Sequence, residues 1–381
     1  MNRAILLFFA ATLIISCSRT HTPIPGIPEI DVTLRFPERE INLTDIAYVT
    51  YVHLDASNDD FLYRGTIVYI TENRIIVVDQ SSGSVLFFSK EGTPISRFNR
   101  LGQGPGEYFD RLVSVAYDEA TDEVFLFGLR LPFIQVYSST GEHKRRIDLP
   151  PASPRREFMQ LRIFDDQSLL MYDMRNRFYR GHPNSTLGRT GYAESAFFLI
   201  CRTDGQIVYQ IPVPASNICF GTPVVPDIVS HPDGFLLGDP AVDTIFLFCR
   251  NKTLTPILWR TPPVGSLNSE VFITNTFDSR HFQFFNIRTF YPWRSRYYIR
   301  DKQTGRIYRQ NITLPDFQDR RFTIAPALHN SFHKNGTHII LDLQELKQAY
   351  RQNRLSGELK ELVSTLCEWN SNDVFAFIRF K

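Results

Sequence analysis

One short pattern of residues recurs along most of this chain at a nearly fixed interval. Each copy is an apolar run followed by polar residues and a Gly or Asn, which predicts a β-strand that enters a tight turn. The copies span residues 85–92, 134–141, 198–205, 245–251 and, more weakly, 296–305. The turn residues Gly92 and Gly141 are 49 residues apart, and Cys201 and Cys249 in the next two copies are 48 apart. This period constrains the fold most, because it requires one structural unit repeated along the chain.

A second apolar strand precedes the first four copies, at residues 74–78, 123–127, 168–172 and 234–237. These runs are continuously apolar, which is typical of strands buried on both faces. Four antiparallel strands in about 50 residues form one blade of a β-propeller. Five copies and a degenerate sixth fill residues 60–381, so we expect an all-β, six-bladed β-propeller. The step from Gly141 to Gly205 is 64 residues, which predicts an insertion at residues 174–194 in the third blade.

The two ends of the repeat array predict how the ring closes. Residues 48–54 form an apolar strand before the first blade, and residues 374–380 form the last strand of the chain. Pairing them completes the sixth blade with an N-terminal strand and removes an open sheet edge. Residues 343–350 and 358–366 carry apolar side chains at helical spacing. We therefore expect a small helical insertion near the C-terminus, which packs on the rim of the sixth blade or, alternatively, docks a partner.

Composition supports a large β-fold and argues against one class of partner. Of the 381 residues, 43% are hydrophobic, and the 32 Phe and 16 Tyr suit packed strands. The 42 basic and 40 acidic residues leave a net charge of +2, whereas nucleic-acid binders normally carry a basic excess. The last four cysteines are Cys201, Cys219, Cys249 and Cys367. Cys201 and Cys249 lie in predicted strands and are interpreted as small buried hydrophobic residues. A disulfide bond among the four is the alternative, since an exported protein can form one.

The first forty residues are interpreted as an export and anchoring segment. Arg3 precedes an apolar run at residues 4–15, which is too short to span a bilayer as a helix but fits a secretory signal peptide. Ser16 and Cys17 complete a sequence that resembles the bacterial lipobox, which implies lipid attachment at Cys17. The alternative is an ordinary signal peptide with a chance cysteine. The expected division is a lipoprotein signal peptide at 1–16, a lipidated tether at 17–40 and the propeller at 41–381.

A glycine-rich loop follows the first complete blade. Its sequence is Gly102-Gln103-Gly104-Pro105-Gly106-Glu107-Tyr108. Three glycines and a proline in five residues predict a tight loop with special backbone angles. A phosphate-binding loop is the functional alternative, but it is disfavoured because no Lys-Ser/Thr pair and no obvious helix follow.

This loop and the earlier strand containing Tyr51-Val52-His53-Leu54 resemble features of the six-bladed β-propeller lipoproteins of Bacteroidota. That group is related in fold to the NHL and TolB-like propellers and is largely uncharacterised, so the resemblance implies fold and location more than function. Surface-directed lipoproteins of these bacteria often carry acidic residues directly after the cysteine. None follows Cys17 directly, which favours the outer membrane, facing the periplasm. The family's Asn-Pro before the last strand is absent here, where residues 369–374 contain no proline.

No arrangement of residues predicts catalysis, a metal site or a cofactor. The chain has no Gly-x-Ser-x-Gly sequence. His329 and His333 are four apart in a predicted strand or loop, where that spacing separates two residues by ~13 Å, too far to chelate one metal ion. Aspartates near turns could supply ligands like those of propeller lactonases, but they more commonly bond their own backbone. These aspartates are Asp79, Asp118, Asp165, Asp239 and Asp301.

The candidate for ligand contact is an aromatic and basic run at residues 290–298. Trp293 offers a face for stacking, and Arg294 and Arg296 can bind carboxylates; the alternative is an ordinary turn and strand of the fifth blade. We expect a non-enzymatic binding or scaffold module, held at the membrane by its lipid anchor, for a glycan, peptide or protein. The alternative is a metal-dependent hydrolase, a lactonase or a lyase that uses carboxylates lining the channel.

Overall fold

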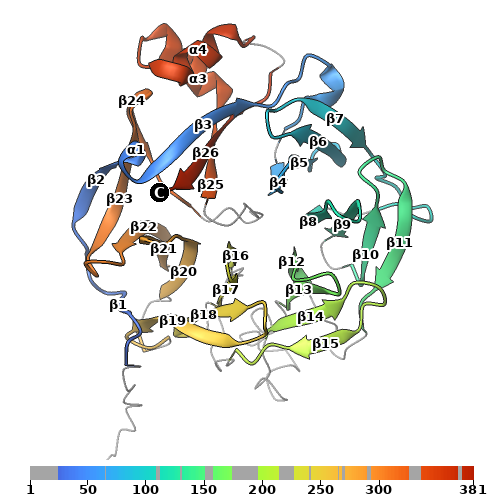
Figure 1. Ribbon diagram of the computed structural model, residues 1–381, viewed down its shortest axis with the longest axis horizontal. Helices are drawn as coiled ribbons and strands as arrows, with labels where there is room; N and C mark the ends of the chain where they lie inside the picture. Colours follow the sequence, from blue (N-terminus) through green and yellow to red (C-terminus); the bar gives the residue numbers. More distant parts are fainter. Residues whose placement is uncertain are drawn as a thin grey trace, which may run out of the picture.

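The computed structural model contains six β-sheets arranged in a ring, which confirms the six-bladed propeller (Figure 1). It describes residues 25–64, 66–108, 112–128, 131–150, 158–173, 196–213, 227–239, 242–264, 266–267, 271–289, 293–325, 336–367 and 371–381. The predictions for the signal peptide, for Cys17, for the insertion at 174–194, for Cys219, and for His329 and His333 fall outside these residues.

In blades 1 to 3 the first strand lines the centre of the ring and the fourth lies at its outer edge (Figure 1). Blade 1 contains β4 (Thr66–Ile70), β5 (Arg74–Asp79), β6 (Ser84–Ser89) and β7 (Pro94–Phe98). Blade 2 contains β8 (Leu112–Asp118), β9 (Glu123–Gly128), β10 (Phe133–Tyr137) and β11 (His143–Asp148). Blade 3 contains β12 (Phe158–Ile163), β13 (Ser168–Asp173), β14 (Phe197–Cys201) and β15 (Ile207–Gln210).

Blades 4 and 5 follow the same order, whereas blade 6 has three strands among the described residues. Blade 4 contains β16 (Asp227–His231), β17 (Gly234–Gly238), β18 (Thr244–Cys249) and β19 (Leu254–Thr261). Blade 5 contains β20 (Val271–Asp278), β21 (Phe282–Thr289), β22 (Arg294–Asp301), β23 (Ile307–Leu314) and β24 (Phe317–Phe322). Blade 6 contains β25 (Gly336–Leu341), β26 (Val374–Phe380) and β3 (Ala47–His53). Strands β5, β9, β13 and β17 are almost entirely buried, as their apolar runs predict.

The ring closes by pairing its two ends, as predicted. Strand β3 is antiparallel to β26, with His53 opposite Val374 and Ala47 opposite Phe380. Because β26 also pairs with β25, the N-terminal strand becomes the outer strand of blade 6. Closure therefore depends on contacts between residues more than 300 positions apart in the sequence.

The N-terminal segment also reinforces two other blades. Strand β1 (Glu29–Asp31) pairs in parallel with β19 of blade 4, and β2 (Glu38–Asn42) pairs in parallel with β23 of blade 5. Strand β1 and the first three residues of β2 lie within residues 17–40, the segment expected to form the tether. Strands β1 and β2 are not predictable from the sequence, because a parallel strand added to an outer edge needs no hairpin, and such short polar segments show no apolar period.

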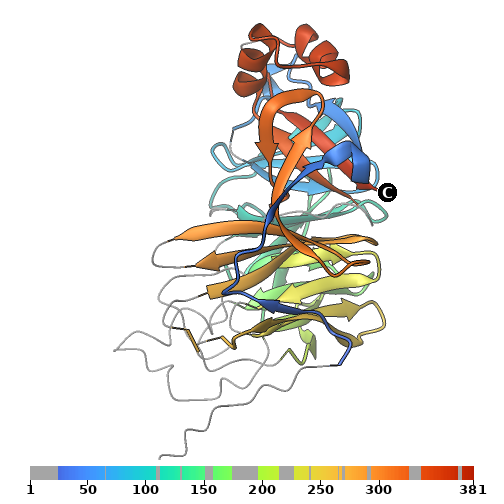
Figure 2. The ribbon, with the colours of Figure 1, turned by 90° about the vertical axis from the view of Figure 1, so that its left-hand side faces the viewer.

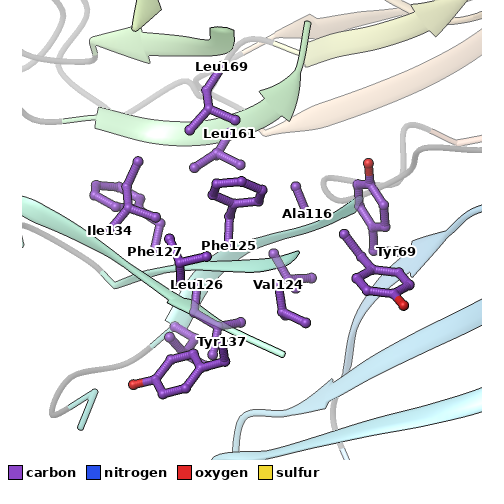
Figure 3. Close-up of a cluster of buried hydrophobic side chains, with 14 of the residues drawn as sticks. Tyr69, Ala116, Val124, Phe125, Leu126, Phe127, Ile134, Tyr137, Leu161 and Leu169 are labelled. Carbon is purple, nitrogen blue, oxygen red and sulfur yellow. The ribbon is translucent and has the colours of Figure 1, made fainter. Parts of the chain in front are cut away.

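The hydrophobic core lies between neighbouring blades. One cluster joins blades 1, 2 and 3, and four others lie between blades 3 and 4, 4 and 5, 5 and 6, and 6 and 1. In Figure 3, Phe125 on β9 faces Leu161 on β12, with Leu169 on β13 behind it. Each sheet is therefore packed on both faces, which explains the continuous apolar runs.

The predicted helical insertion lies between β25 and β26. It consists of α3 (Leu343–Arg351) and α4 (Gly357–Thr365), which lie at the rim of the ring (Figures 1 and 2). Leu346 and Leu359 are fully buried in the cluster shared by blades 5 and 6, so the helices pack on blade 6 as expected. Among the described residues, the other helical turns are α1 (Leu43–Ile46) and η1 (Asp59–Phe61). Across the described ranges, no helix is both long and apolar enough to span a membrane.

Candidate functional site

One end of the ring carries two tight turns from each of blades 1 to 5. Antiparallel pairing puts the turn after the first strand and the turn after the third strand at the same end of a blade. We call this end the turn face. The ends of the inner strands of blades 1 to 4 line one pocket there, so these blades present the turn face on the same side.

The pocket lies where the inner strands end around the centre of the ring, and its volume is about 400 Å³. Blade 1 contributes residues 69–72 and blade 2 contributes residues 117–120. Blade 3 adds Ile163, and blade 4 adds His231 and Arg250 together with its first turn. The lining therefore combines carboxylates from blades 1 and 2 with a cation and an imidazole from blade 4.

The Glu119 carboxylate connects blade 2 to blade 1. It accepts hydrogen bonds from the Thr71 hydroxyl, from the Asn73 backbone N–H at 3.1 Å and from the Asn73 side-chain amide at 2.8 Å. Burial alone would raise the pKa of Glu119, but these donors outweigh it and hold the pKa below its ordinary value. Glu119 is thus a charged residue that joins blades 1 and 2, and both of its carboxylate oxygens accept hydrogen bonds from blade 1.

Asp118, beside Glu119, is held by a buried arginine of blade 3. Arg202 is 4% exposed, and its Nη2 lies 2.7 Å from Asp118 and 3.0 Å from Glu123. Its guanidinium also lies over the Phe125 ring, 5.0 Å from the centroid. Burial would raise the pKa of Asp118, but the hydrogen bond from Arg202 helps to keep it below its ordinary value.

His231 is engaged at both ring nitrogens. The Asp233 backbone N–H donates to Nδ1 at 3.1 Å, which places the imidazole proton on Nε2. That nitrogen lies 3.3 Å from an Asp278 oxygen on blade 5, which also accepts from the Lys302 ammonium at 2.7 Å. His231 therefore joins blades 4 and 5, and neither nitrogen is free to act as a general base.

Arg250 is the exception among the charged groups of the pocket. Its guanidinium lies over the rings of Phe235 and Phe164, 4.9 and 5.5 Å from their centroids. The residue is exposed, and within the described ranges its guanidinium has no hydrogen-bond acceptor and no ion-pair partner. Burial of part of the side chain lowers its pKa, while attraction to Asp165 and Tyr69 opposes that shift. An arginine stays protonated under such a shift, so the pocket holds a positioned cation.

Arg250 was not predicted from the sequence, although the repeats carry a signal for its position. The repeats place a basic residue directly after the third strand in four blades, and these residues are Lys90, Arg202, Arg250 and Lys302. A basic residue in a turn is usually a solvated surface group, so the position alone does not predict a site.

The turn aspartates behave as caps. Asp79 accepts from the Ser81 N–H and hydroxyl, Asp165 from the backbone of Gln167 and Ser168, and Asp301 from the backbone of Gln303 and Thr304. Asp118 accepts from the Ala120 N–H, and Asp239 is buried. In the part of the chain that the structure describes, no three His, Cys, Asp or Glu residues gather closely enough to hold a metal ion.

The glycine-rich loop is bonded to itself. The Gly104 N–H donates to the Glu107 carboxylate at 2.7 Å, and a Cβ on Gly102 would lie 2.0 Å from the same oxygen. Gly106 has a φ of +74°, which favours glycine. Gln103 and Pro105 are exposed. The steric contact at Gly102 and the positive φ of Gly106 therefore explain these two glycines without a ligand.

Tyr108 fastens this loop to blade 1. Its side chain is 1% exposed, its hydroxyl donates to the Gly83 carbonyl at 2.6 Å, and the Arg100 N–H donates to the hydroxyl at 3.0 Å. Burial raises the pKa of Tyr108 to about 12, so the phenol stays neutral. The Tyr137 hydroxyl of blade 2 donates to the Gly106 carbonyl at 2.8 Å. The loop thus joins blades 1 and 2.

The predicted ligand contacts lie away from the pocket. Strand β22 ends at Asp301 on the turn face, so its start, with Arg294 and Arg296, lies toward the opposite end of the ring. Trp293 is 62% exposed, and the two arginines share one face of the strand. Their role in binding stays a prediction.

Cys201, Cys249 and Cys367 are free thiols, and the first two are half-buried rather than fully buried.

Comparison with known proteins supports the propeller fold. A family model described as a domain of unknown function, DUF4934, matches residues 27–378. The chain belongs to this family. A search of curated proteins finds no match.

Two proteins from Bacteroides are among the solved structures that share the fold. A protein of Bacteroides fragilis NCTC 9343, named as a "putative exported protein", has 15% sequence identity and a TM-score of 0.61, covering 93% of this chain and 99% of its own. A member of the DUF4221 family from Bacteroides vulgatus ATCC 8482 has 9% identity and a TM-score of 0.51, covering 88% and 97%. At these identities the likeness shows the propeller fold alone.

Proposed function

We propose that this protein is an exported, lipid-anchored binding module whose pocket on the turn face takes a small ligand. One observation carries the proposal: Asp118, Glu119 and His231 are committed to protein partners, whereas Arg250 projects into a pocket of about 400 Å³ without one among the described residues. A site organised in this way binds rather than transfers protons. A hydrolase or lyase that uses channel carboxylates is not favoured, because those carboxylates already accept hydrogen bonds from the protein.

A blocking variant tests the pocket directly. Ala120 is exposed, lines the pocket and contributes only its backbone N–H to the Asp118 turn. Ala120→Trp fills the pocket without disturbing that hydrogen bond, and Gln303→Trp places the same side chain on an exposed turn of blade 5, outside the pocket lining.

The assay is affinity selection of an envelope extract followed by mass spectrometry. The wild type and Gln303→Trp are expected to retain a small molecule that Ala120→Trp does not retain. Equal retention by all three proteins, or retention by none, would refute binding in this pocket.

The anchor is part of the same proposal. It is supported by the signal-like residues 1–16 and Cys17, and by the exported name of the fold relative. Because β1 begins at Glu29, only 11 residues separate it from Cys17, and an extended chain of that length reaches roughly 40 Å. The ring then works close to the outer membrane, on the periplasmic side. Cys17→Ala is expected to move the folded protein to the soluble fraction, and continued sedimentation with membranes contradicts the anchor.

A further inference from the structure

The basic residue after the third strand occupies an equivalent position in successive blades. The backbone N–H groups of Arg202, Arg250 and Lys302 donate to a carbonyl in the first turn of their own blade, at 3.0, 3.1 and 2.9 Å respectively. Arg202 and Arg250 then extend over an aromatic ring of the preceding blade. The two arginines can therefore be compared directly.

Blade 2 supplies Arg202 with two carboxylates. Asp118 ends the first strand of that blade, Glu123 begins the second, and the two residues face each other in the sheet. Arg202 lies within 3.0 Å of both. The cation is thus neutralised by the blade on which it lies.

Blade 3 lacks both carboxylates at the place that Arg250 reaches. The residue after its first strand is Phe164 and the first residue of its second strand is Ser168, and the Phe164 N–H donates to the Ser168 carbonyl at 3.0 Å. Nearby Asp165 attracts Arg250, but its Oδ1 accepts from the N–H and hydroxyl of Ser168 in its own turn, and no ion pair joins Asp165 to Arg250 within the described residues. The arginine is therefore present in both blades, but Phe164 and Ser168 stand where blade 2 has the carboxylates Asp118 and Glu123.

We propose that Arg250 binds the carboxylate of a small ligand, which supplies the charge that blade 2 supplies to Arg202. This inference rests on the proposed binding function and names its ligand class. A planar guanidinium held against two rings presents its N–H edge to a carboxylate with little loss of conformational freedom. The rings exclude water from one side of the pair, which strengthens the attraction.

The rest of the pocket defines the body and the charge of the ligand. Tyr69, Ile70 and Ile163 line it with apolar surface, which suits an aromatic or aliphatic group beside the carboxylate. Glu72 and Glu119 line the same pocket and repel a dianion more strongly than a monoanion. The ligand class is therefore a monocarboxylate with an apolar body rather than a phosphate ester.

Three probes separate these features by isothermal titration calorimetry. They are N-acetylphenylalanine, its amide, which differs only in lacking the carboxylate, and phenyl phosphate, which carries a dianion. The acid is expected to bind, and the amide and phenyl phosphate are expected to bind at least about tenfold more weakly, the range for a lost charge-assisted hydrogen bond.

Two variants test the role of the cation, and a third serves as a control. Arg250→Met keeps the apolar stem and is expected to weaken binding of N-acetylphenylalanine at least about tenfold. Ser168→Glu restores one carboxylate at the position of Glu123 and is expected to weaken binding similarly, because Arg250 then pairs within the protein. Arg306→Met, on an exposed turn of blade 5, is expected to bind like the wild type.

Each unexpected result overturns the inference. Equal binding of the acid and the amide, unchanged binding by Arg250→Met, tighter binding of phenyl phosphate, or no saturable binding of the acid up to its solubility limit would each do so. The pocket-blocking experiment with Ala120→Trp asks only whether the pocket retains any molecule. A protein that passes that test and fails this one has the proposed function with another ligand class.

Discussion

The Asn372 side chain joins the two ends of the chain at the closure of the ring. It is 2% exposed, and its oxygen accepts from the Tyr63 N–H at 3.1 Å. Its nitrogen donates to the Leu54 carbonyl at 3.1 Å and to the Phe61 carbonyl at 3.0 Å. One amide thus satisfies three buried backbone groups that follow the closing strand β3. Asn372→Ala removes all three hydrogen bonds at once.

The cost of this change follows from the number of groups left without a partner. A buried backbone group that loses its hydrogen bond costs about 1–3 kcal/mol, and partial entry of water reduces the sum, so we expect a loss of about 4 kcal/mol. The entropy of unfolding for 381 residues is ~0.8 kcal/mol/K at ~2.1 cal/mol/K per residue. The melting temperature should therefore fall by about 5 °C.

Differential scanning calorimetry and urea unfolding of the purified protein measure this change. The control is Asn251→Ala, because Asn251 is exposed and accepts only from the backbone and hydroxyl of Thr253 in its own turn. We expect the control to cost about 1 kcal/mol or less. A shift no larger for Asn372→Ala than for the control would refute the argument that this amide fastens the ring.

Two further predictions concern contacts between blades. Tyr108→Phe removes both buried hydrogen bonds of the hydroxyl and is expected to lower the free energy of unfolding by about 1–3 kcal/mol, measured by the urea midpoint. Arg202→Met leaves the Asp118 carboxylate without its cation, whereas Glu123 keeps its ion pair with Arg145, and we expect a cost of about 3 kcal/mol at pH 7. Because the folded protein, with the help of Arg202, holds the pKa of Asp118 below its unfolded value, the contribution of this carboxylate is present above the unfolded pKa of ~4 and is lost as the pH falls through the folded one. Urea midpoints between pH 7 and pH 3 should therefore fall less steeply for Arg202→Met than for the wild type, and parallel curves would contradict the assignment.

The blade architecture was predictable because it follows from local rules repeated along the chain. A strand buried on both faces must be continuously apolar, and a tight turn requires residues such as Gly141 and Gly205, which have φ of +85° and +77°. Both signals recur with the blade period, so the ring and the pairing of its ends could be inferred without coordinates. The inserted helices α3 and α4 were equally visible, since their apolar residues follow the helical period.

The N-terminal strands and the closing amide were not predictable in the same way. Strand β2 has the polar sequence Glu-Arg-Glu-Ile-Asn, and its partner β23 lies about 270 residues away. Asn372 lies just before a strand like many turn residues, and its partner Tyr63 is 309 residues distant. Hydrogen bonds between such distant groups leave no local pattern, because the partner is chosen by the geometry of the closed ring.

In the candidate site, the local sequence predicts the position of each arginine but not whether its charge is paired. Arg202 and Arg250 both follow a cysteine at the end of the third strand, so the repeat pattern is enough to place each of them at the start of a turn on the same end of the ring. Whether the cation is neutralised depends on the neighbouring blade, which presents Asp118 and Glu123 to one arginine and Phe164 to the other. This difference follows from the folded arrangement of the blades, because an ion pair depends on the distance between charges in space and not on their separation along the chain.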